Sequence, residues 1–333
     1  MSEFLSLSFE EVLQRLETPA DTLILFHRGP DADAVGSAFA LKKILSDLGS
    51  RAWCVCSDEV PQRLQFLTDG KQESVLASAI PEELDVTRII SVDTASPAQL
   101  GSLWELYGGQ IDLMLDHHGK GEPYADHYIL PHAAATGEIM FDLVKQLATD
   151  GRVEITDALC TGLYAAISSD TGGFRFSNVT PDTHLRAAEL TASGIDCAKI
   201  NQKLFETKTM EQLRAQAAGI SNLRTYADGR ISVITFPYAL KAALGLKDEH
   251  LETLVDVARS LMGSQIAIAL RQPGTDGVFR ASIRSSCDYD VSALCASFGG
   301  GGHQKAAGCT ITAPDMDAAV EQLISAIDFL ELP

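Results

Sequence analysis

The sequence predicts a mixed α/β protein: a doubly wound, mainly parallel sheet domain, a smaller α+β domain after it, and a cleft between the two. The length of 333 residues suits two domains of ordinary size. In the N-terminal half, short apolar runs alternate with helical patterns, which is typical of a parallel sheet covered on both faces. After Tyr226 strands follow one another more closely, which indicates a second domain of α+β type.

Caps and apolar runs define the elements of the first domain. Residues 5–16 are expected to form a helix with Ser8 as its N-cap and Glu11 in the capping-box position. The helix over residues 157–169 is apolar nearly all round, which predicts burial. Further helices are expected over residues 38–48 and 181–193, and strands over residues 22–27, 51–56, 88–93 and 111–116.

Three segments divide the chain. Residues 1–195 hold the first domain, residues 196–225 are polar and expected as a helical connector, and residues 226–333 hold the second domain. The second domain carries 8 basic and 13 acidic residues against 18 and 32 before it, so it is the less acidic part. Its expected elements are a helix over 251–262, strands over 230–236, 264–271 and 278–284, and a last strand and helix after a glycine run.

The composition excludes several classes of protein. A net charge of −19 argues against binding of long nucleic acid, because such proteins carry a basic surface that replaces counterions. Any nucleotide substrate should therefore be short and held locally. No apolar run approaches about 18 residues, and the first residues lack the basic segment of a secretory signal. Seven scattered cysteines without a CxxC motif are expected as free thiols, which indicates a cytoplasmic protein.

Ligand-type residues follow the first strand. His27, Asp31 and Asp33 lie within seven residues, and Pro30 and Gly36 argue against a regular element there. Divalent cations such as Mn²⁺ accept this mixture of oxygen and imidazole ligands. The alternative is an ordinary N-cap loop, in which aspartate is common.

Three further segments place acidic or imidazole groups at the ends of elements. Asp93 ends one strand, Asp116-His117-His118 ends the next, and Asp170 follows the buried helix. Adjacent histidines on an extended segment point in opposite directions, so they are expected to have different roles. Ligands of open α/β sheets bind outside the carboxyl ends of the strands, so all four segments should meet at one edge. Each alone has a plain structural alternative, a cap, a turn or a surface pair.

The charges of this cluster require cations. Asp31, Asp33, Asp93 and Asp170 sum to −4, and crowding them without cations would raise their pKa values. Two divalent cations would balance them. Two metal ions about 3.5–4 Å apart hydrolyse phosphate esters by activating a bridging water and clamping the oxygens of the displacement.

The motifs HxxxDxD, VDT, DHH and SDTGGFRFSNVT resemble those of the DHH phosphoesterase superfamily. The run GGGGHQKAAG resembles the signature of the DHH-associated C-terminal domain. Because the motifs extend from His27 to Gly308, the resemblance covers nearly the whole chain. The length makes the chain similar to the stand-alone nanoRNase and pAp phosphatase branch, and this implies a catalytic first domain and a substrate-binding second domain.

The resemblance also implies a role for each residue. The expected ligands of two Mn²⁺ ions, with Mg²⁺ or Co²⁺ as substitutes, are His27 and Asp31 for the first, Asp33, His117 and Asp170 for the second, and Asp93 for both. His118 would face the substrate phosphate or the leaving oxygen, and Asp116 would orient an imidazole, so His118, Asp116 and Asp93 form the expected catalytic group. A homodimer follows from the resemblance alone.

The glycine run is expected to bind a phosphate. Gly299–Gly302 can bring successive backbone N–H groups to one point, His303 adds a donor, and Arg284 offers a planar fork. A flexible loop is the alternative. The expected substrate-binding residues are Arg284, Gly300, Gly301, Gly302 and His303.

The expected function is hydrolysis of short oligoribonucleotides (nanoRNA) and 3′-phosphoadenosine 5′-phosphate (pAp). Hydrolysis of cyclic di-AMP or pApA is the rival, with the same metal site and a different pocket. Inorganic pyrophosphatases would share the metal ligands but not the glycine-rich signature. A catalytically inactive nucleotide sensor would show substituted ligands, whereas all seven expected positions, His118 included, are filled.

Overall fold

The computed structural model describes residues 4–68, 74–119 and 121–327. The chain forms two compact units, Met1–Thr207 and Lys208–Pro333. Among the described residues, no helix is both long and apolar enough to cross a membrane. All seven cysteines are free thiols, as the sequence predicted.

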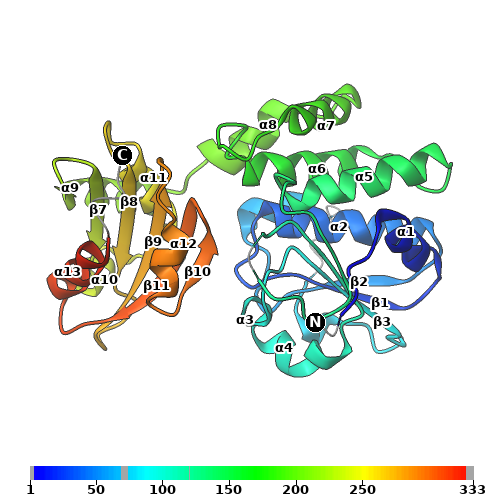
Figure 1. The fold of residues 1–333 in the computed structure, drawn as a ribbon, viewed down its shortest axis with the longest axis horizontal. Helices are drawn as coiled ribbons and strands as arrows, with labels where there is room; N and C mark the ends of the chain where they lie inside the picture. Colours follow the sequence, from blue (N-terminus) through cyan, green and yellow to red (C-terminus); the bar gives the residue numbers. More distant parts are fainter. Residues whose placement is uncertain (1–3, 69–73, 120, 328–333) are drawn as a thin grey trace. The chain divides into compact units, whose positions relative to one another are not determined.

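A five-stranded parallel sheet forms the centre of the first unit (Figure 1). The four predicted strands are confirmed, and β5 is an additional edge strand that the sequence analysis missed. In spatial order the strands are β2 (Ala52–Val55), β1 (Thr22–Leu25), β3 (Arg88–Val92), β4 (Leu113–Asp116) and β5 (His127–Ile129). The carboxyl ends of these parallel strands share one edge, where ligands of such sheets bind.

Helices cover both faces of this sheet (Figure 1). Ile24 and Phe26 pack toward one helical layer, whereas Leu23 and Leu25 pack toward the other, as the alternation of strand side chains requires. The first layer consists of α1 (Phe9–Glu17), α2 (Ala32–Asp47), α5 (Thr136–Thr149), α6 (Asp157–Asp170) and α7 (Pro181–Ala192), and the second of α3 (Pro97–Leu100) and α4 (Ser102–Tyr107).

Helix starts follow their caps. Ser8 and Glu11 form the predicted capping box, although α1 begins at Phe9 rather than at residue 5. The larger difference is α2, which begins at Ala32, six residues before the predicted start, so the interpretation of residues 32–37 as irregular is wrong. Asp31 caps this helix, and Gly36 lies inside it.

Gly36 is explained by a close helix crossing. A Cβ at this position would lie 2.5 Å from the Gly162 carbonyl oxygen of α6. Glycine therefore permits α2 and α6 to pack with their backbones in close approach, and it does not break the helix. The predicted helix 157–169 is confirmed as α6, and most of its residues are buried.

A six-stranded mixed sheet forms the described part of the second unit; β7 and β8 pair in parallel, and its other neighbouring strands pair antiparallel. Helices α12 and α13 cover one face, and α9 and α11 cover part of the other. In spatial order the strands are β10 (Gly301–His303), β11 (Ala306–Thr312), β9 (Val278–Ser285), β8 (Ile266–Arg271), β7 (Ile231–Phe236) and β6 (Leu223–Tyr226). The helices are α9 (Met210–Ser221), α10 (Tyr238–Ala243), α11 (Leu254–Arg259), α12 (Val291–Ala296) and α13 (Met316–Ala326).

The stretch 196–225, expected as one connector, divides between the two units. Helix α8 (Cys197–Asn201) and a π-helical turn over Gln202–Glu206 belong to the first unit. Helix α9 and strand β6 belong to the second, because β6 pairs with β7 and α9 packs beneath it. The predicted helix 251–262 is shorter as well, a 3-10 turn over Asp248–Leu251 followed by α11.

Candidate metal centre

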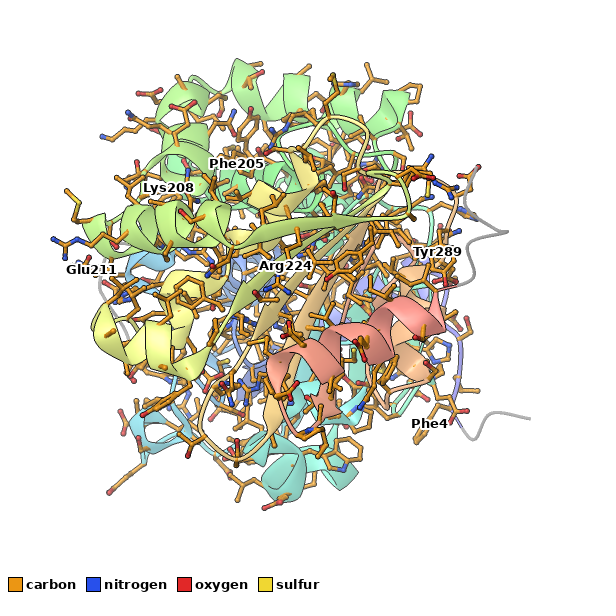
Figure 2. The ribbon with its side chains drawn as sticks, turned by 90° about the vertical axis from the view of Figure 1, so that its left-hand side faces the viewer. Phe4, Phe205, Lys208, Glu211, Arg224 and Tyr289 are labelled. Atoms are coloured by element: carbon orange, nitrogen blue, oxygen red, sulfur yellow. The ribbon has the colours of Figure 1, made fainter. Side chains whose placement is uncertain are left out.

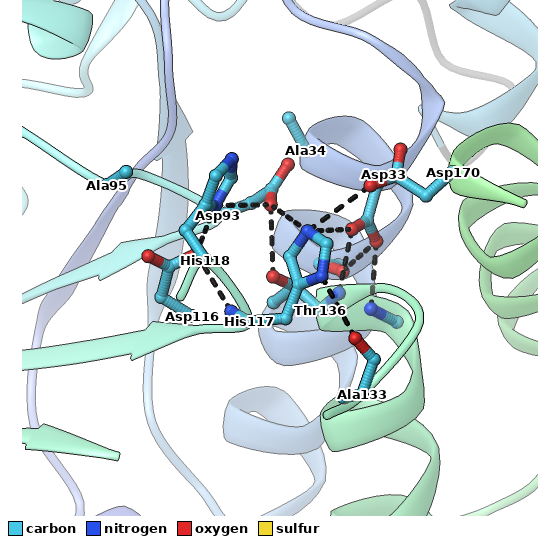
Figure 3. A network of polar contacts seen from close by, with 12 residues as sticks. Asp33, Ala34, Asp93, Ala95, Asp116, His117, His118, Ala133, Thr136 and Asp170 are labelled. Atoms are coloured by element: carbon cyan, nitrogen blue, oxygen red, sulfur yellow. Dashed lines mark hydrogen bonds and ion pairs between the residues drawn. The ribbon is translucent and has the colours of Figure 1, made fainter. Parts of the chain in front are cut away.

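Four segments of the first unit bring carboxylates and imidazoles together at the carboxyl edge of its sheet (Figure 3). The β1–α2 turn supplies His27, Asp31 and Asp33. Asp93 follows β3, the Asp116-His117-His118 segment ends β4, and Asp170 ends α6. The sequence-predicted ligands are thus all in one place.

Asp31 and Asp33 are each held at the N-terminus of a helix. Asp31 Oδ1 accepts hydrogen bonds from the backbone N–H groups of Asp33 and Ala34 of α2, both at 3.0 Å. Asp33 accepts from the N–H groups of Thr136 (2.7 Å) and Gly137 (2.8 Å) at the start of α5. Helix N-termini stabilise anions, so both carboxylates are fixed in position before any ligand binds. The N-cap and the metal-ligand interpretations of Asp31 are therefore compatible.

Asp93 occupies an unusual backbone conformation. Its φ of 53° lies in the left-handed region, which aspartate tolerates better than most side chains. Thr136 Oγ1 donates a hydrogen bond of 3.0 Å to Asp93 Oδ1. The Tyr124 hydroxyl contacts the Thr94 carbonyl (3.2 Å) and Ser91 Oγ (3.1 Å), so both sides of the turn are supported. The turn aims the Asp93 carboxylate into the cluster (Figure 3).

Asp93 belongs to three groups of ligand atoms, each with its atoms within 4.8 Å of one another. His27 and Asp31 share one group with it, Asp33 and His117 a second, and Asp116 and His118 a third. His27 Nε2 lies 3.5 Å from Asp93 Oδ2 and 3.7 Å from Asp31 Oδ1.

His117 joins the second group to Asp170. Its Nε2 lies 3.2 Å from Asp170 Oδ2, 3.7 Å from Asp93 Oδ1 and 3.9 Å from Asp33 Oδ2. Figure 3 shows its ring between the Asp93 and Asp33 carboxylates. One nitrogen therefore faces three carboxylates from three different elements.

The backbone selects the nitrogen that each histidine presents. His27 Nδ1 lies 3.0 Å from the Arg28 carbonyl oxygen, and His117 Nδ1 lies 3.2 Å from that of Ala133. A carbonyl only accepts, so Nδ1 carries the proton in both rings and Nε2 of the neutral ring presents a lone pair. Lone pairs that face carboxylate oxygens repel them unless a proton or a cation lies between, so the residues fit a cation.

His118 has a different partner. Its Nδ1 lies 2.7 Å from Asp116 Oδ1, which also accepts from the His117 backbone N–H at 2.9 Å. Asp116 thus orients the His118 imidazole, while His117 Nε2 and His118 Nδ1 lie 3.7 Å and 3.8 Å from the same Asp93 Oδ1. The two rings are only 4.8 Å apart rather than on opposite sides, because β4 ends at Asp116 and the histidines lie beyond the extended segment.

Burial and mutual repulsion perturb the acids of the cluster. Burial, together with the charges of Asp93 and Asp170, raises the pKa of Asp33 well above its usual range. Burial raises the pKa of Asp170 to about 6. Burial alone would lower the pKa of His117, but its hydrogen bond to Asp170 and the surrounding carboxylates raise it well above the usual value. The cluster therefore retains protons at the positions where divalent cations would replace them.

Thr136 is the contact that sequence reasoning missed. The sequence assigns no role to this residue. In the structure the N-cap of α5 is Ala135, which has no side-chain acceptor, and the Asp33 carboxylate takes that place from a distance of more than a hundred residues along the chain. A helix N-terminus whose cap residue cannot accept a hydrogen bond was the only available signal.

The predicted phosphate-binding residues lie in the second unit. Arg284 is half-buried on β9, donates to the Ile283 carbonyl at 3.1 Å and remains cationic, although burial lowers its pKa. Residues Gly301–His303 form the exposed edge strand β10. The amides of Gly299 and Gly300 donate to the Ala296 and Cys295 carbonyls. The expected nest of four glycine amides therefore differs from the structure, because the end of α12 uses two of them.

Comparison with known proteins places these features in a family context. A family model described as the DHH family, N-terminal domain, matches residues 21–167, and a DHHA1 domain model matches residues 236–328. The chain is 30% identical over 319 residues to the bifunctional oligoribonuclease and PAP phosphatase NrnA of Thermus thermophilus. The aligned region covers 95% of this chain and 91% of that relative.

Two further similarities concern a longer protein and a solved structure. The chain is 26% identical over 344 residues to the cyclic-di-AMP phosphodiesterase PdeA of Listeria monocytogenes, covering 96% of this chain but 49% of that protein. The crystal structure of an exopolyphosphatase-related protein from Bacteroides fragilis superposes with a TM-score of 0.85 at 21% identity, covering 98% of this chain and 97% of the other. This last similarity establishes the shared fold.

Proposed function

The chain belongs to the DHH family and is a hydrolase of phosphate esters, and we propose that it acts on short oligoribonucleotides and on pAp with two divalent cations. The single observation that carries the proposal is that Asp93 is common to the group of ligand atoms with His27 and Asp31 and to the group with Asp33 and His117. Carboxylates mixed with imidazoles favour Mn²⁺, with Mg²⁺ or Co²⁺ as substitutes.

The first unit supplies the hydrolytic chemistry. His27 and Asp31 would hold one cation, Asp33, His117 and Asp170 the second, and Asp93 both. When bound, such cations make water a stronger nucleophile near neutral pH and neutralise charge on the phosphate. The chain's own contribution is to fix the ligands, since two helix N-termini and two backbone carbonyls hold them in place before binding.

His118 has a separate role in this proposal. Asp116 holds Nδ1 of His118 at 2.7 Å, and this fixes the orientation of the ring. Although burial opposes it, the Asp116 hydrogen bond raises the pKa of His118, so the ring holds its proton more firmly. A protonated imidazole in this position would donate to the phosphate or to the leaving oxygen.

The second unit binds the non-scissile phosphate in this proposal. Arg284 supplies a cationic fork, and Gly301, Gly302 and His303 supply further donors from an exposed edge strand. An edge strand such as β10 has backbone N–H groups on its outer side that pair with no other strand of the sheet. Arg284 is the residue whose loss should affect substrate affinity more than metal binding. Homodimer assembly stays a prediction of the family resemblance.

The substrate class follows from charge and similarity. The relative of 30% identity is named for activity on oligoribonucleotides and PAP. A surface of net charge −19 disfavours a long polyanion, so short strands are the expected substrates. The second candidate is a cyclic dinucleotide, favoured by the 26% identity to a cyclic-di-AMP phosphodiesterase over nearly the whole chain.

A side-by-side hydrolysis assay with Mn²⁺ tests the proposal. The substrates are pAp, RNA of two to five nucleotides, pApA, cyclic di-AMP and a 24-nucleotide RNA. We expect pAp and the short RNAs to turn over fastest and the long RNA to react least. Clear preference for cyclic di-AMP would invert the ranking, and no turnover with metal bound would refute it. Asp93→Asn is the inactive control.

A further inference from the structure

One face of the second unit's sheet carries two arginines in line. Arg280, Ser282 and Arg284 alternate along β9 with residues of the buried core, so all three lie on the same face. We name these three residues the β9 strip. Arg280 is exposed, and the other two are half-buried.

The surroundings of the strip differ along its length. On this face α9 packs against β7, and α11 packs against β7, β8 and β9 near Arg284, whereas α12 and α13 belong to the opposite face. On the neighbouring strand β11, Ala306 lies opposite Arg284 and Gly308 lies opposite Ser282. No bulky side chain of β11 therefore stands beside the strip between its two arginines.

Arg280 occupies an electrostatically unfavourable place. It lies directly opposite Arg271 of β8, and like charges at such positions repel. Arg271 has acidic neighbours, since Asp248 and Glu252 stabilise its charge. Among the described residues, Arg280 makes no hydrogen bond and no ion pair. Its guanidinium fork is therefore available to an anion.

The spacing separates Arg280 from the phosphate position at Arg284. Four residues along a strand span about 13 Å, which exceeds the distance between successive phosphates of a nucleic acid strand. A ligand with a phosphate at Arg284 reaches Arg280 only if a further nucleotide follows. A mononucleotide whose phosphate binds at Arg284 therefore does not reach Arg280.

We infer that Arg280, next to Arg271, is a second phosphate-binding position on the β9 strip, which takes a further nucleotide of a short RNA strand. The inference rests on the proposed function and adds length selectivity to it. Arginine forks bind phosphate in bidentate fashion, and single-strand sites commonly track the backbone with cationic side chains. The affinity for RNA then increases as the strand lengthens from two to three or four nucleotides. It does not increase further for longer strands, because the strip ends there.

Kinetics with two matched variants test the inference. Arg280→Gln should raise KM for three- and four-nucleotide RNA about tenfold, the effect of one charge-assisted hydrogen bond, with kcat and pAp hydrolysis unchanged. Arg224→Gln is the control. Arg224, labelled in Figure 2, lies on β6 of the same sheet and faces the side opposite to the β9 strip. It forms an ion pair with Asp317 at 2.9 Å. This variant should match the wild type on every substrate.

Equilibrium binding separates this inference from the proposed function. Fluorescence anisotropy with labelled RNA of two, three and four nucleotides is measured in EDTA, where no cleavage occurs. Arg280→Gln should reduce the slope of log affinity against log salt by about 0.7 for the longer strands, the value for one lost phosphate contact. Equal loss on all lengths, or no loss on any, would overturn the inference even if the wild-type enzyme cleaved none of the substrates.

Discussion

At the scale of single residues, Asp93 links the two halves of the site. Its carboxylate oxygens lie 3.5 Å from His27 Nε2, 3.7 Å from His117 Nε2 and 3.8 Å from His118 Nδ1, so one carboxylate faces three imidazoles. Burial alone would raise its pKa, but the His27 hydrogen bond and the charges of His118 and His117 lower it. The pKa of Asp93 is therefore lowered, as is that of Asp31, whereas the pKa values of Asp33 and Asp170 are raised.

Thr136 positions Asp93, and its removal should weaken metal binding. Its hydroxyl is fully buried and donates to Asp93 at 3.0 Å. Thr136→Val keeps the shape but removes this donor, so we expect about tenfold weaker Mn²⁺ activation, in the range for groups that orient metal ligands. The measurement is the Mn²⁺ concentration dependence of hydrolysis.

Thr136→Ser is the matched control, since it retains the hydroxyl and should restore Mn²⁺ activation to near the wild-type level. A purely structural role of Thr136 would lower the thermal stability of Thr136→Val and leave its Mn²⁺ dependence unchanged. That outcome would contradict the assignment of Thr136 as a positioning residue.

The sequence motifs allowed the members of the cluster to be predicted, but not the contacts that support them. The carboxylates and imidazoles could be listed from the sequence because strand ends collect at one sheet edge. The Thr136–Asp93 hydrogen bond, whose partners are 43 residues apart, could not be predicted, because the register of α5 against β3 depends on packing. The same holds for the use of the Gly299 and Gly300 amides by α12.

At the scale of elements, α2 shows how tertiary packing overrides a local signal. Gly36 and Pro30 suggested an irregular segment, yet Asp31 caps a helix directly after the turn. The α2–α6 crossing then requires the glycine, because the two backbones approach closely at Gly162. The strands and α6 were predictable because their apolar patterns agree with their burial; the start of α2 was not.

This crossing predicts opposite effects for two glycine substitutions. A Cβ at Gly36 would lie 2.5 Å from the Gly162 carbonyl oxygen, whereas a Cβ at Gly162 would lie 3.7 Å from the Gly36 oxygen, an ordinary contact. Gly36→Ala should destabilise the protein by about 1–2 kcal/mol, since the strain exceeds the gain in helix propensity. Gly162→Ala should be neutral or stabilising by up to about 1 kcal/mol. Urea denaturation measures both, and equal effects would contradict the proposed crossing.

At the scale of the whole molecule, protons would compete with the proposed cations for the same site. Burial raises the pKa of Asp170 to about 6, and burial with neighbouring charges raises that of Asp33. An acid whose pKa is raised on folding binds protons more tightly in the folded state. Without metal, its stabilising effect is therefore present at low pH and is lost as the pH rises through about 6. Protonated His117, with its raised pKa, acts in the same direction.

Divalent cations should consequently stabilise the protein more at pH 7.5 than at pH 5.5. At the higher pH fewer protons remain to be displaced, and each group with a pKa near 6 weakens apparent metal affinity about tenfold per pH unit below that value. Thermal unfolding with Mn²⁺ or with EDTA at both pH values measures the difference, with potassium chloride of equal ionic strength as the control. An equal Mn²⁺-induced shift at both pH values would contradict the proton competition.

If Asp93 joins two cation sites in one chain, the number of bound metal ions depends on this residue. Equilibrium dialysis against Mn²⁺ at pH 7.5 should give two ions per wild-type chain. Asp93→Asn should lose at least one ion and nearly all hydrolysis, while Asp182→Asn, on the exposed first turn of α7, should keep both. A wild-type protein that binds one ion or none, or an Asp93→Asn variant that retains two, would exclude two cation sites joined by Asp93.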